Sequence, residues 1–112
     1  MQVGEESNGR EISLRVGQVF TLALPENPST GYAWKFVTAD NVERNGAPIC
    51  SKISDVFVPP AGAASSRAGS PGVHQWRFRA EATGTAFIEM RLTRGWDLDS
   101  AKRSFSLRLF VT

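Results

Sequence analysis

Hydrophobic and polar residues alternate with a period of two along most of this chain. Such alternation sends successive side chains to opposite faces, as β-strands do. The positions that share one face in each run are Ile12, Leu14 and Val16; Phe20, Leu22 and Leu24; Trp34 and Phe36; His74, Trp76, Phe78 and Ala80; Ala86, Ile88, Met90 and Leu92; and Phe105, Leu107, Leu109 and Val111. Residues 49–58 are also rich in β-branched and aromatic side chains, and they predict a further strand with a less regular register. No window has the 3.6-residue period that is typical of an amphipathic helix.

Turn-forming residues separate these runs, at positions 16–18, 25–31, 45–46, 59–72, 83–84 and 94–102. Several short strands punctuated in this way predict an all-β protein, and an immunoglobulin-like antiparallel β-sandwich fits the length of 112 residues. The cysteine pair of antibody domains is absent, because Cys50 is the one cysteine in the chain. We assign residues 10–112 to a single domain and the polar residues 1–9 to a flexible N-terminal tail.

The segment 59–72 consists mainly of proline, glycine, alanine and serine. Such residues bury too little surface to order themselves, so we expect a mobile loop. A plain tether between two strands and a functional loop are equally compatible with this composition.

Composition excludes several classes of protein. Hydrophobic residues make up 41% and charged residues 21% of the chain, as in soluble globular proteins. The formal net charge of +2 is too small to indicate a nucleic-acid partner, and no apolar run approaches the roughly 18 residues of a membrane helix. Residues 1–9 contain no apolar signal region. Either the protein is cytosolic, or it reaches another compartment with a targeting segment that is absent from this chain.

Cys50 and His74 are the only candidates for nucleophilic catalysis by a Cys/His pair. The alternative, which we favour, is that Cys50 is a small buried apolar side chain. One cysteine and one histidine cannot supply the usual ligands of a zinc site, so we expect no metal and no cofactor.

The turn after residue 26 has a distinctive sequence, Asn27-Pro28-Ser29-Thr30-Gly31-Tyr32. Pro28 fixes its own φ, and Gly31 permits a positive φ that other residues resist. The side chains of Asn27, Ser29 and Thr30 can hydrogen-bond to the nearby backbone. The segment therefore predicts a stiff, polar loop tip, although its local chemistry alone indicates no more than a strand connection.

Together with two later segments, this turn resembles the motifs of the chagasin family of cysteine peptidase inhibitors. The family has Asn-Pro-Thr-Thr-Gly-Tyr or -Phe, and here Ser29 replaces a threonine but keeps the hydroxyl. A Gly-x-Gly-Gly loop precedes a strand in the family, and here Gly69-Ser70-Pro71-Gly72 precedes the run that contains His74. An Arg-Pro-Trp loop precedes its last strand, and here Arg94-Gly95-Trp96 precedes the run from Phe105. The resemblance covers the chain from about the first strand to its end.

The resemblance implies a β-sandwich in which the three loops lie side by side and fill the active-site cleft of papain-like cysteine peptidases, cathepsin-L-like enzymes among them. It implies a reversible, non-covalent inhibitor and not an enzyme, and a monomer suffices for such a wedge. Thr30 would lie nearest the catalytic cysteine. The residues expected to bind the peptidase are Asn27, Pro28, Ser29, Thr30, Gly31, Tyr32, Gly69, Ser70, Gly72, Arg94, Gly95 and Trp96.

Within this set, Trp96 is the expected anchor, because a large aromatic side chain on a glycine-flanked loop is costly to expose without a partner. Arg94 is either a contact to a polar or acidic group of the enzyme or a solvated surface charge. Two residues depart from the family pattern: Gly95 replaces a proline, which predicts a more flexible third loop, and Pro71 replaces a glycine, which predicts a different shape for the second.

Two other functions are compatible with the sequence. One is a β-sandwich interaction or adhesion module without a peptidase target, which would not need the three motifs. The other is an enzyme that uses Cys50 and His74, which requires these two side chains to meet in a cleft.

Overall fold

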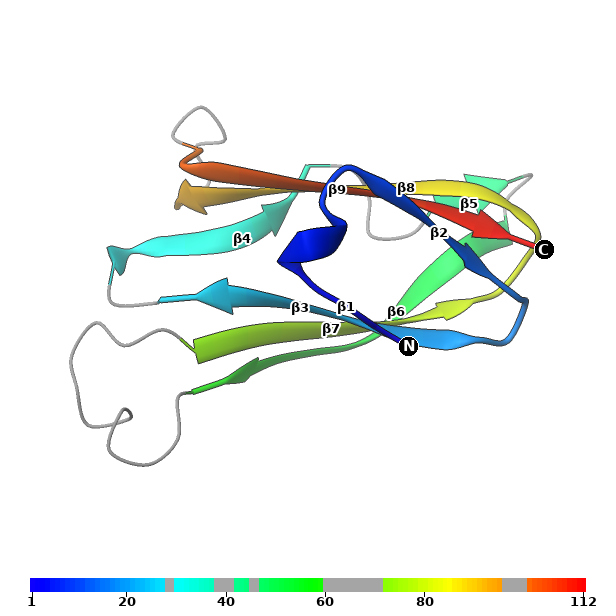
Figure 1. Ribbon diagram of the computed structural model, residues 1–112, viewed down its shortest axis with the longest axis horizontal. Helices are drawn as coiled ribbons and strands as arrows, with labels where there is room; N and C mark the ends of the chain where they lie inside the picture. Colours follow the sequence, from blue (N-terminus) through cyan, green and yellow to red (C-terminus); the bar gives the residue numbers. More distant parts are fainter. Residues whose placement is uncertain (28–29, 38–41, 45–46, 60–71, 96–100) are drawn as a thin grey trace.

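Two β-sheets packed face to face form the protein in the computed structural model (Figure 1). The structure describes residues 1–27, 30–37, 42–44, 47–59, 72–95 and 101–112. The five-stranded sheet has the order β1-β3-β7-β6-β5, and the four-stranded sheet has the order β2-β9-β8-β4. The strands are β1 (Gln2–Val3), β2 (Arg10–Leu14), β3 (Val19–Glu26), β4 (Tyr32–Phe36), β5 (Val42–Arg44), β6 (Ala47–Val58), β7 (Gly72–Ala80), β8 (Gly84–Arg94) and β9 (Arg103–Val111).

The prediction of an all-β immunoglobulin-like sandwich is confirmed, with one correction to the strand directions. The pairs β1–β3 and β2–β9 are parallel, whereas the other neighbouring strands are antiparallel. Both parallel pairs involve strands of the N-terminal segment, which runs along an edge of each sheet in turn. Among the described residues, no helix is long and apolar enough to cross a membrane.

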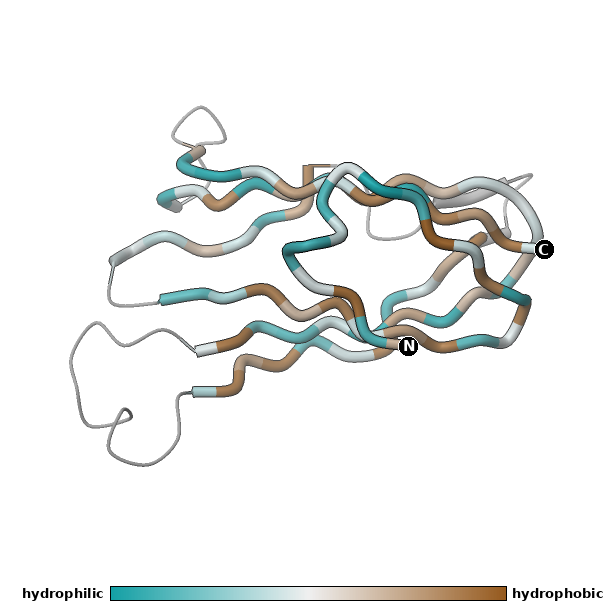
Figure 2. The backbone as a smooth tube through the Cα atoms, viewed as in Figure 1, coloured by the Kyte–Doolittle hydropathy of each residue, from teal (hydrophilic) through white to brown (hydrophobic). Residues whose placement is uncertain are grey.

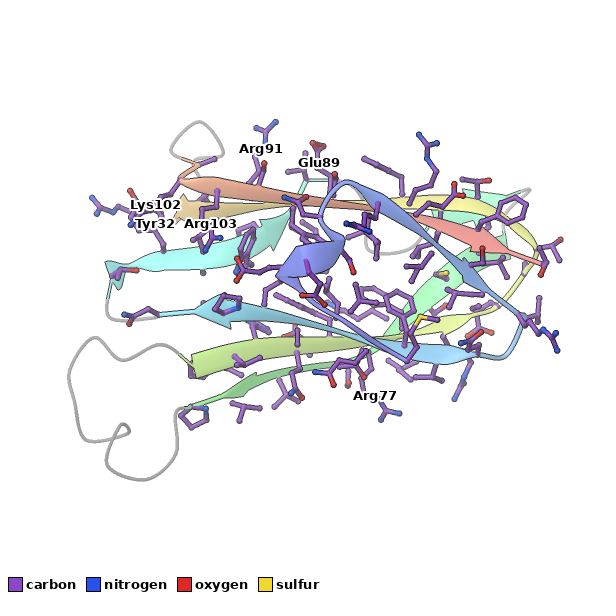
Figure 3. The ribbon with its side chains drawn as sticks, viewed as in Figure 1. Tyr32, Arg77, Glu89, Arg91, Lys102 and Arg103 are labelled. Atoms are coloured by element: carbon purple, nitrogen blue, oxygen red, sulfur yellow. The ribbon has the colours of Figure 1, made fainter. Side chains whose placement is uncertain are left out.

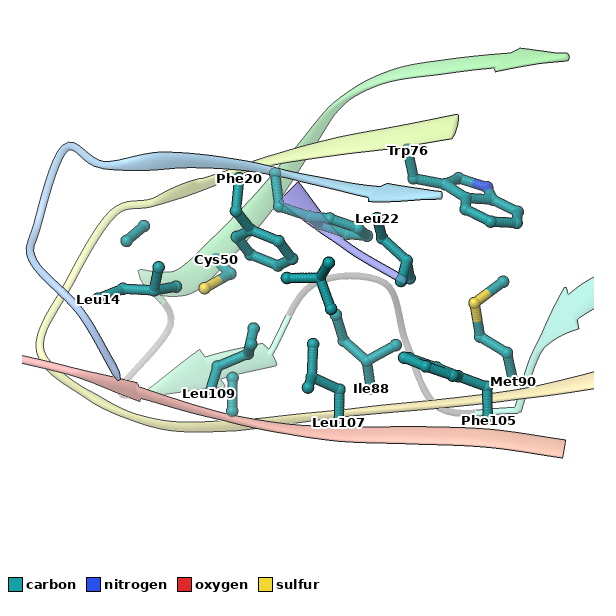
Figure 4. Packing of buried hydrophobic residues seen from close by; sticks show 14 of the residues in the cluster. Leu14, Phe20, Leu22, Cys50, Trp76, Ile88, Met90, Phe105, Leu107 and Leu109 are labelled. Atoms are coloured by element: carbon teal, nitrogen blue, oxygen red, sulfur yellow. The ribbon is translucent and has the colours of Figure 1, made fainter. Parts of the chain in front are cut away.

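The core lies between the sheets and consists of the inward positions of the alternating runs (Figures 2 and 4). Phe20 stacks on Phe78 with ring centroids 5.3 Å apart, and Phe36 meets Trp76 edge-on. The inward assignment of Val16 was wrong. β2 ends at Leu14, and Val16 lies in the following turn, where its side chain is exposed.

Residues 1–9, which the sequence analysis assigned to a flexible tail, are tied to both sheets in the structure. Val3 is 2% exposed and β1 pairs with β3, while a short 3-10 helix, η1 (Glu5–Ser7), leads on to β2. Asn8 donates a hydrogen bond from its amide nitrogen to the carbonyl of Ser104, and it accepts one from Ser106 N. The composition of this segment does not indicate these contacts, because apart from Val3, which joins the core, they use backbone and amide groups.

The strand predicted over residues 49–58 is present as the longer β6, and its register shifts between Lys52 and Ser54. A register shift of this kind inserts an extra residue, which explains why the alternation in this stretch is irregular.

Candidate functional site

Three loops leave the same end of the sandwich (Figure 1). The first joins β3 to β4, the second joins β6 to β7 and the third joins β8 to β9. In the five-stranded sheet, Glu26 at the end of β3 pairs with Gly72 at the start of β7. In the other sheet, Tyr32 at the start of β4 pairs with Arg94 at the end of β8. The register of the two sheets therefore brings together loops that are far apart in the sequence.

Hydrogen bonds within the first loop close it into a tight turn. The carbonyl of Asn27 accepts from Thr30 N at 3.1 Å and from Thr30 Oγ1 at 2.8 Å. The same hydroxyl oxygen accepts from Tyr32 N at 3.3 Å. Gly31 has φ +81°, in the left-handed region that favours glycine. The predicted positive φ and backbone-bonded hydroxyl are thus present, and Thr30 is exposed at the tip.

A buried carboxylate joins the two sides of this loop. Glu26, 8% exposed, immediately precedes the loop, and its Oε2 accepts from Trp34 N at 3.0 Å. The indole Nε1 of Trp34 donates back to the carbonyl of Pro25 at 2.9 Å. Both bonds cross from β3 to β4 and hold the mouth of the loop at a fixed width.

The same carboxylate contacts the strands of the second loop. Both oxygens of Glu26 lie 3.2 Å from His74 Nδ1, on β7. The other ring nitrogen of His74 contacts Asp55 Oδ1, on β6. Partial burial would raise the pKa of Asp55, but the hydrogen bond and charge of His74, together with Lys52, hold that pKa below its ordinary value.

The first and third loops are joined through the ring of Tyr32 (Figure 3). The Arg94 guanidinium lies over this ring at 5.1 Å from its centroid, and Lys102 Nζ lies at 5.5 Å. Cation–π contacts of this kind hold β8 and the start of β9 against β4. A cavity of about 290 Å³ opens beside the ring, and Glu26, Thr30 and Lys102 are among the residues that line it.

The structure explains why two positions of the predicted motifs carry glycine. A Cβ on Gly72 would lie 2.5 Å from the Val58 carbonyl oxygen and 2.6 Å from the Phe57 ring, so no larger residue fits between β6 and β7 here. Gly95 has φ +62°, which proline cannot adopt. At the start of the third loop, the backbone of this protein therefore has a conformation that the family's proline could not adopt.

The structure describes seven of the predicted peptidase-binding residues, and all seven lie at the loop end. They are Asn27, Thr30, Gly31, Tyr32, Gly72, Arg94 and Gly95. The others, Pro28, Ser29, Gly69, Ser70 and Trp96, lie outside the described residues, as do Pro71 and the expected mobile loop apart from its ends.

The arrangement rules out the Cys50/His74 enzyme. Cys50 is 3% exposed in the core, and burial, with the nearby charge of Glu81, raises the pKa of its thiol to about 11. Cys50 pairs with Ala80 on β7, six residues from His74, which corresponds to about 20 Å along a strand. In the described part of the chain, no group of three or more His, Cys, Asp and Glu side chains is placed to hold a metal ion.

Sequence reasoning missed Glu26 and Asp55, and it considered His74 only as a catalytic base. A signal for two of them was present, because Glu26 continues the inward series of Leu22 and Leu24, and His74 is inward in its own run. A polar residue at an inward position at the end of an alternating run is expected to be hydrogen-bonded, because buried polar groups need partners. Asp55 follows the register shift of β6, so its facing could not be read from the alternation.

The fold defines a β-sandwich protein with three loops at one end, and comparison with known proteins gives its family. The model of the chagasin family peptidase inhibitor I42 matches residues 13–109. The chain therefore belongs to the chagasin family and is a cysteine protease inhibitor, not an enzyme.

Individual relatives agree with this assignment. Chagasin of Trypanosoma cruzi is 26% identical over 95 residues, which cover 85% of this chain and 82% of the relative. The cysteine protease inhibitor EhICP2 of Entamoeba histolytica has the same fold, with a TM-score of 0.79, 19% identity, and coverage of 99% of this chain and 94% of the other. Amebosin matches with a TM-score of 0.74 and 25% identity, over 100% and 97% of the two chains. PbICP-C, solved in complex with falcipain-2, matches with a TM-score of 0.57 and 19% identity, over 100% and 88%.

Proposed function

We propose that this protein is a reversible, non-covalent inhibitor of papain-like cysteine peptidases, including cathepsin-L-like enzymes, and that it occludes their active-site cleft with the three loops. The observation that carries the proposal is the clustering of seven motif residues at one end of the sandwich. The complex of PbICP-C with falcipain-2 supports a peptidase as the partner. A monomer supplies all three loops, so we propose binding of one inhibitor to one enzyme.

The geometry of the first loop explains how such an inhibitor avoids being cut. A substrate must lie extended and offer a carbonyl to the catalytic thiolate in near-attack geometry. Here the Asn27 carbonyl is already bonded twice to Thr30, and the turn is closed by Gly31. A loop held in this way would block the cleft while its peptide bonds stay out of line for attack, with Thr30 nearest the thiolate.

Stiff loops also favour affinity, because less conformational entropy is lost when they bind. The contacts of Glu26 with Trp34 N and of Arg94 with the Tyr32 ring order both sides of the wedge before the enzyme arrives. In this proposal Arg94 and Trp96 contact one wall of the cleft, and Trp96 is the anchor that becomes buried there. Gly69, Ser70 and Gly72 belong to the loop that would face the opposite wall.

The proposal is tested by titrating papain and a cathepsin-L-like enzyme with the purified protein and following residual activity. We expect saturable inhibition at a ratio near one to one, full recovery of activity on dilution, and an intact inhibitor by mass spectrometry after prolonged incubation. No inhibition of either enzyme at micromolar concentration would refute the proposal. Progressive cleavage of the first loop would refute the account of its resistance.

The contribution of the anchor is tested with Trp96→Ala, which should weaken inhibition by about 2 kcal/mol or more, the range of interface hot spots. Arg77→Ala is the matched control, because Arg77 is exposed on the outer face of β7 and points away from the sandwich (Figure 3). An inhibition constant that Trp96→Ala leaves unchanged would remove this residue from the binding surface.

A further inference from the structure

Glu26, His74 and Asp55 form a continuous polar chain across the mouths of two loops. Glu26 ends the strand that enters the first loop, and it accepts the backbone N–H of Trp34 on the strand that leaves it. Asp55 lies on the strand that enters the second loop, and His74 lies two residues into the strand that leaves it. Together the three side chains therefore link β3, β6 and β7 of one sheet to β4 of the other.

Both ring nitrogens of His74 face carboxylates, which accept hydrogen bonds but cannot donate them when ionised. A neutral imidazole has one N–H and can serve only one of the two, whereas the imidazolium has two and serves both. Among the described residues, the ring also contacts two aromatic side chains, and Lys52 pairs with one of its carboxylate partners. Trp76 stacks on it at 4.0 Å, Phe57 meets it edge-on, and Lys52 Nζ reaches Asp55 at 3.6 Å.

We propose that His74 is a proton-dependent positioning residue for the inhibitory loops: the protonated ring bridges Glu26 and Asp55 and holds the mouths of the first two loops in the shape that a peptidase binds. The inference rests on the proposed inhibition of papain-like enzymes by these loops. His74 has an exposed fraction of 18%, so the bridge is partly shielded from water. Charge-assisted bonds in such a place are stronger than neutral ones.

Loss of the proton removes one of the two bonds and leaves a carboxylate facing a ring lone pair. The loop mouths should then loosen, and ordering them again would oppose binding. Inhibition should therefore weaken as the pH rises and the ring loses its proton.

The test compares inhibition constants of wild type and His74→Gln at pH 5.5 and pH 8.5 against the same peptidase. The ratio of variant to wild type cancels the pH dependence of the enzyme itself. We expect the wild-type advantage to be about three- to tenfold at pH 5.5 and to shrink toward one at pH 8.5, as loss of one charge-assisted hydrogen bond predicts. Arg77→Gln, which removes a positive charge from the outer face of the same strand, should follow the wild-type curve at both pH values.

The protonation of the ring is measured separately by ¹⁵N NMR of the free wild-type protein, which is independent of any peptidase. Both ring nitrogens should carry a proton at pH 5.5. If one does not, the proposal is wrong. Asp55→Asn, which removes one carboxylate from an exposed position, provides a second variant in case His74→Gln does not fold. It should likewise weaken the pH dependence of inhibition.

Parallel curves for wild type and His74→Gln would overturn this inference while leaving the inhibitory function intact. Absence of inhibition by the wild-type protein at both pH values would instead refute the proposed function, and the NMR result would still decide whether the bridge exists.

Discussion

Replacing Glu26 by alanine tests whether the buried carboxylate holds the loop end together. The change removes the acceptor of the buried Trp34 N–H, which costs about 1–3 kcal/mol when nothing replaces it. It also removes the partner of His74 Nδ1, a charge-assisted contact that is worth about 1.5–3 kcal/mol. Because the two contacts share one carboxylate and are not additive, we expect a total loss of about 3 kcal/mol in the free energy of unfolding.

For a domain of this length, each kcal/mol lowers the melting temperature by about 4 °C or more, so Glu26→Ala should melt at least about 10 °C below wild type. Calorimetry at pH 6 measures the shift. Glu26→Gln keeps a carbonyl oxygen for Trp34 N–H but loses the charge that faces His74 Nδ1, so it should lose about 1.5 kcal/mol, about half the loss of Glu26→Ala.

Glu11→Ala is the matched control for this experiment, because Glu11 is exposed on β2 and should change stability by no more than about 0.5 kcal/mol. If Glu26→Ala melts within 2 °C of wild type, the carboxylate does not hold the loop mouth, and the reasoning about the polar chain fails with it.

Three further predictions concern single residues. Gly95→Pro should weaken inhibition and not rigidify the third loop, because its φ of +62° is closed to proline; an inhibition constant at or below the wild-type value would contradict this. Cys50 should resist iodoacetamide in the native protein at pH 8, since burial holds its thiol pKa near 11, and Cys50→Ala should inhibit like wild type; rapid labelling without unfolding would show that the thiol is accessible. The pKa of Asp55 is lowered in the folded state, so its contribution to stability is present above the unfolded pKa near 3.9 and is lost as the pH falls through the folded pKa. Asp55→Asn should therefore lose less stability between pH 5 and pH 2.5 than wild type does. Equal losses in thermal melts would count against the contact with His74.

The alternation of polar and apolar residues was sufficient to predict most of the fold. Phe20, Leu22 and Leu24 face the core as their period of two requires, and so do the inward residues of β7, β8 and β9. Alternation is a local property of a strand, because each side chain points opposite to the one before it whatever the strand pairs with. It fails where a strand ends or shifts register, which is why the inward assignment of Val16 was wrong and why the alternation in the middle of β6 is irregular.

The N-terminal segment illustrates a second limit. Nothing in the composition of residues 1–9 indicates that β1 runs parallel to β3 or that Asn8 bonds to β9. These contacts depend on which backbone groups are left open at the sheet edges, and the edges exist only once the sheets have formed.

By itself, the sequence determined the strands other than β1 and β5, most of their inward faces, the turn chemistry of Thr30 and Gly31, and, through its motifs, a resemblance to the correct family. Only the tertiary structure decided that Tyr32 lies between Arg94 and Lys102, and that Glu26, His74 and Asp55 form one chain. The physical reason is that turn chemistry and alternation depend on neighbours in the chain, whereas these contacts depend on the register between strands. Register places Glu26 beside Gly72 and Tyr32 beside Arg94, and with these pairs it assembles the loop end.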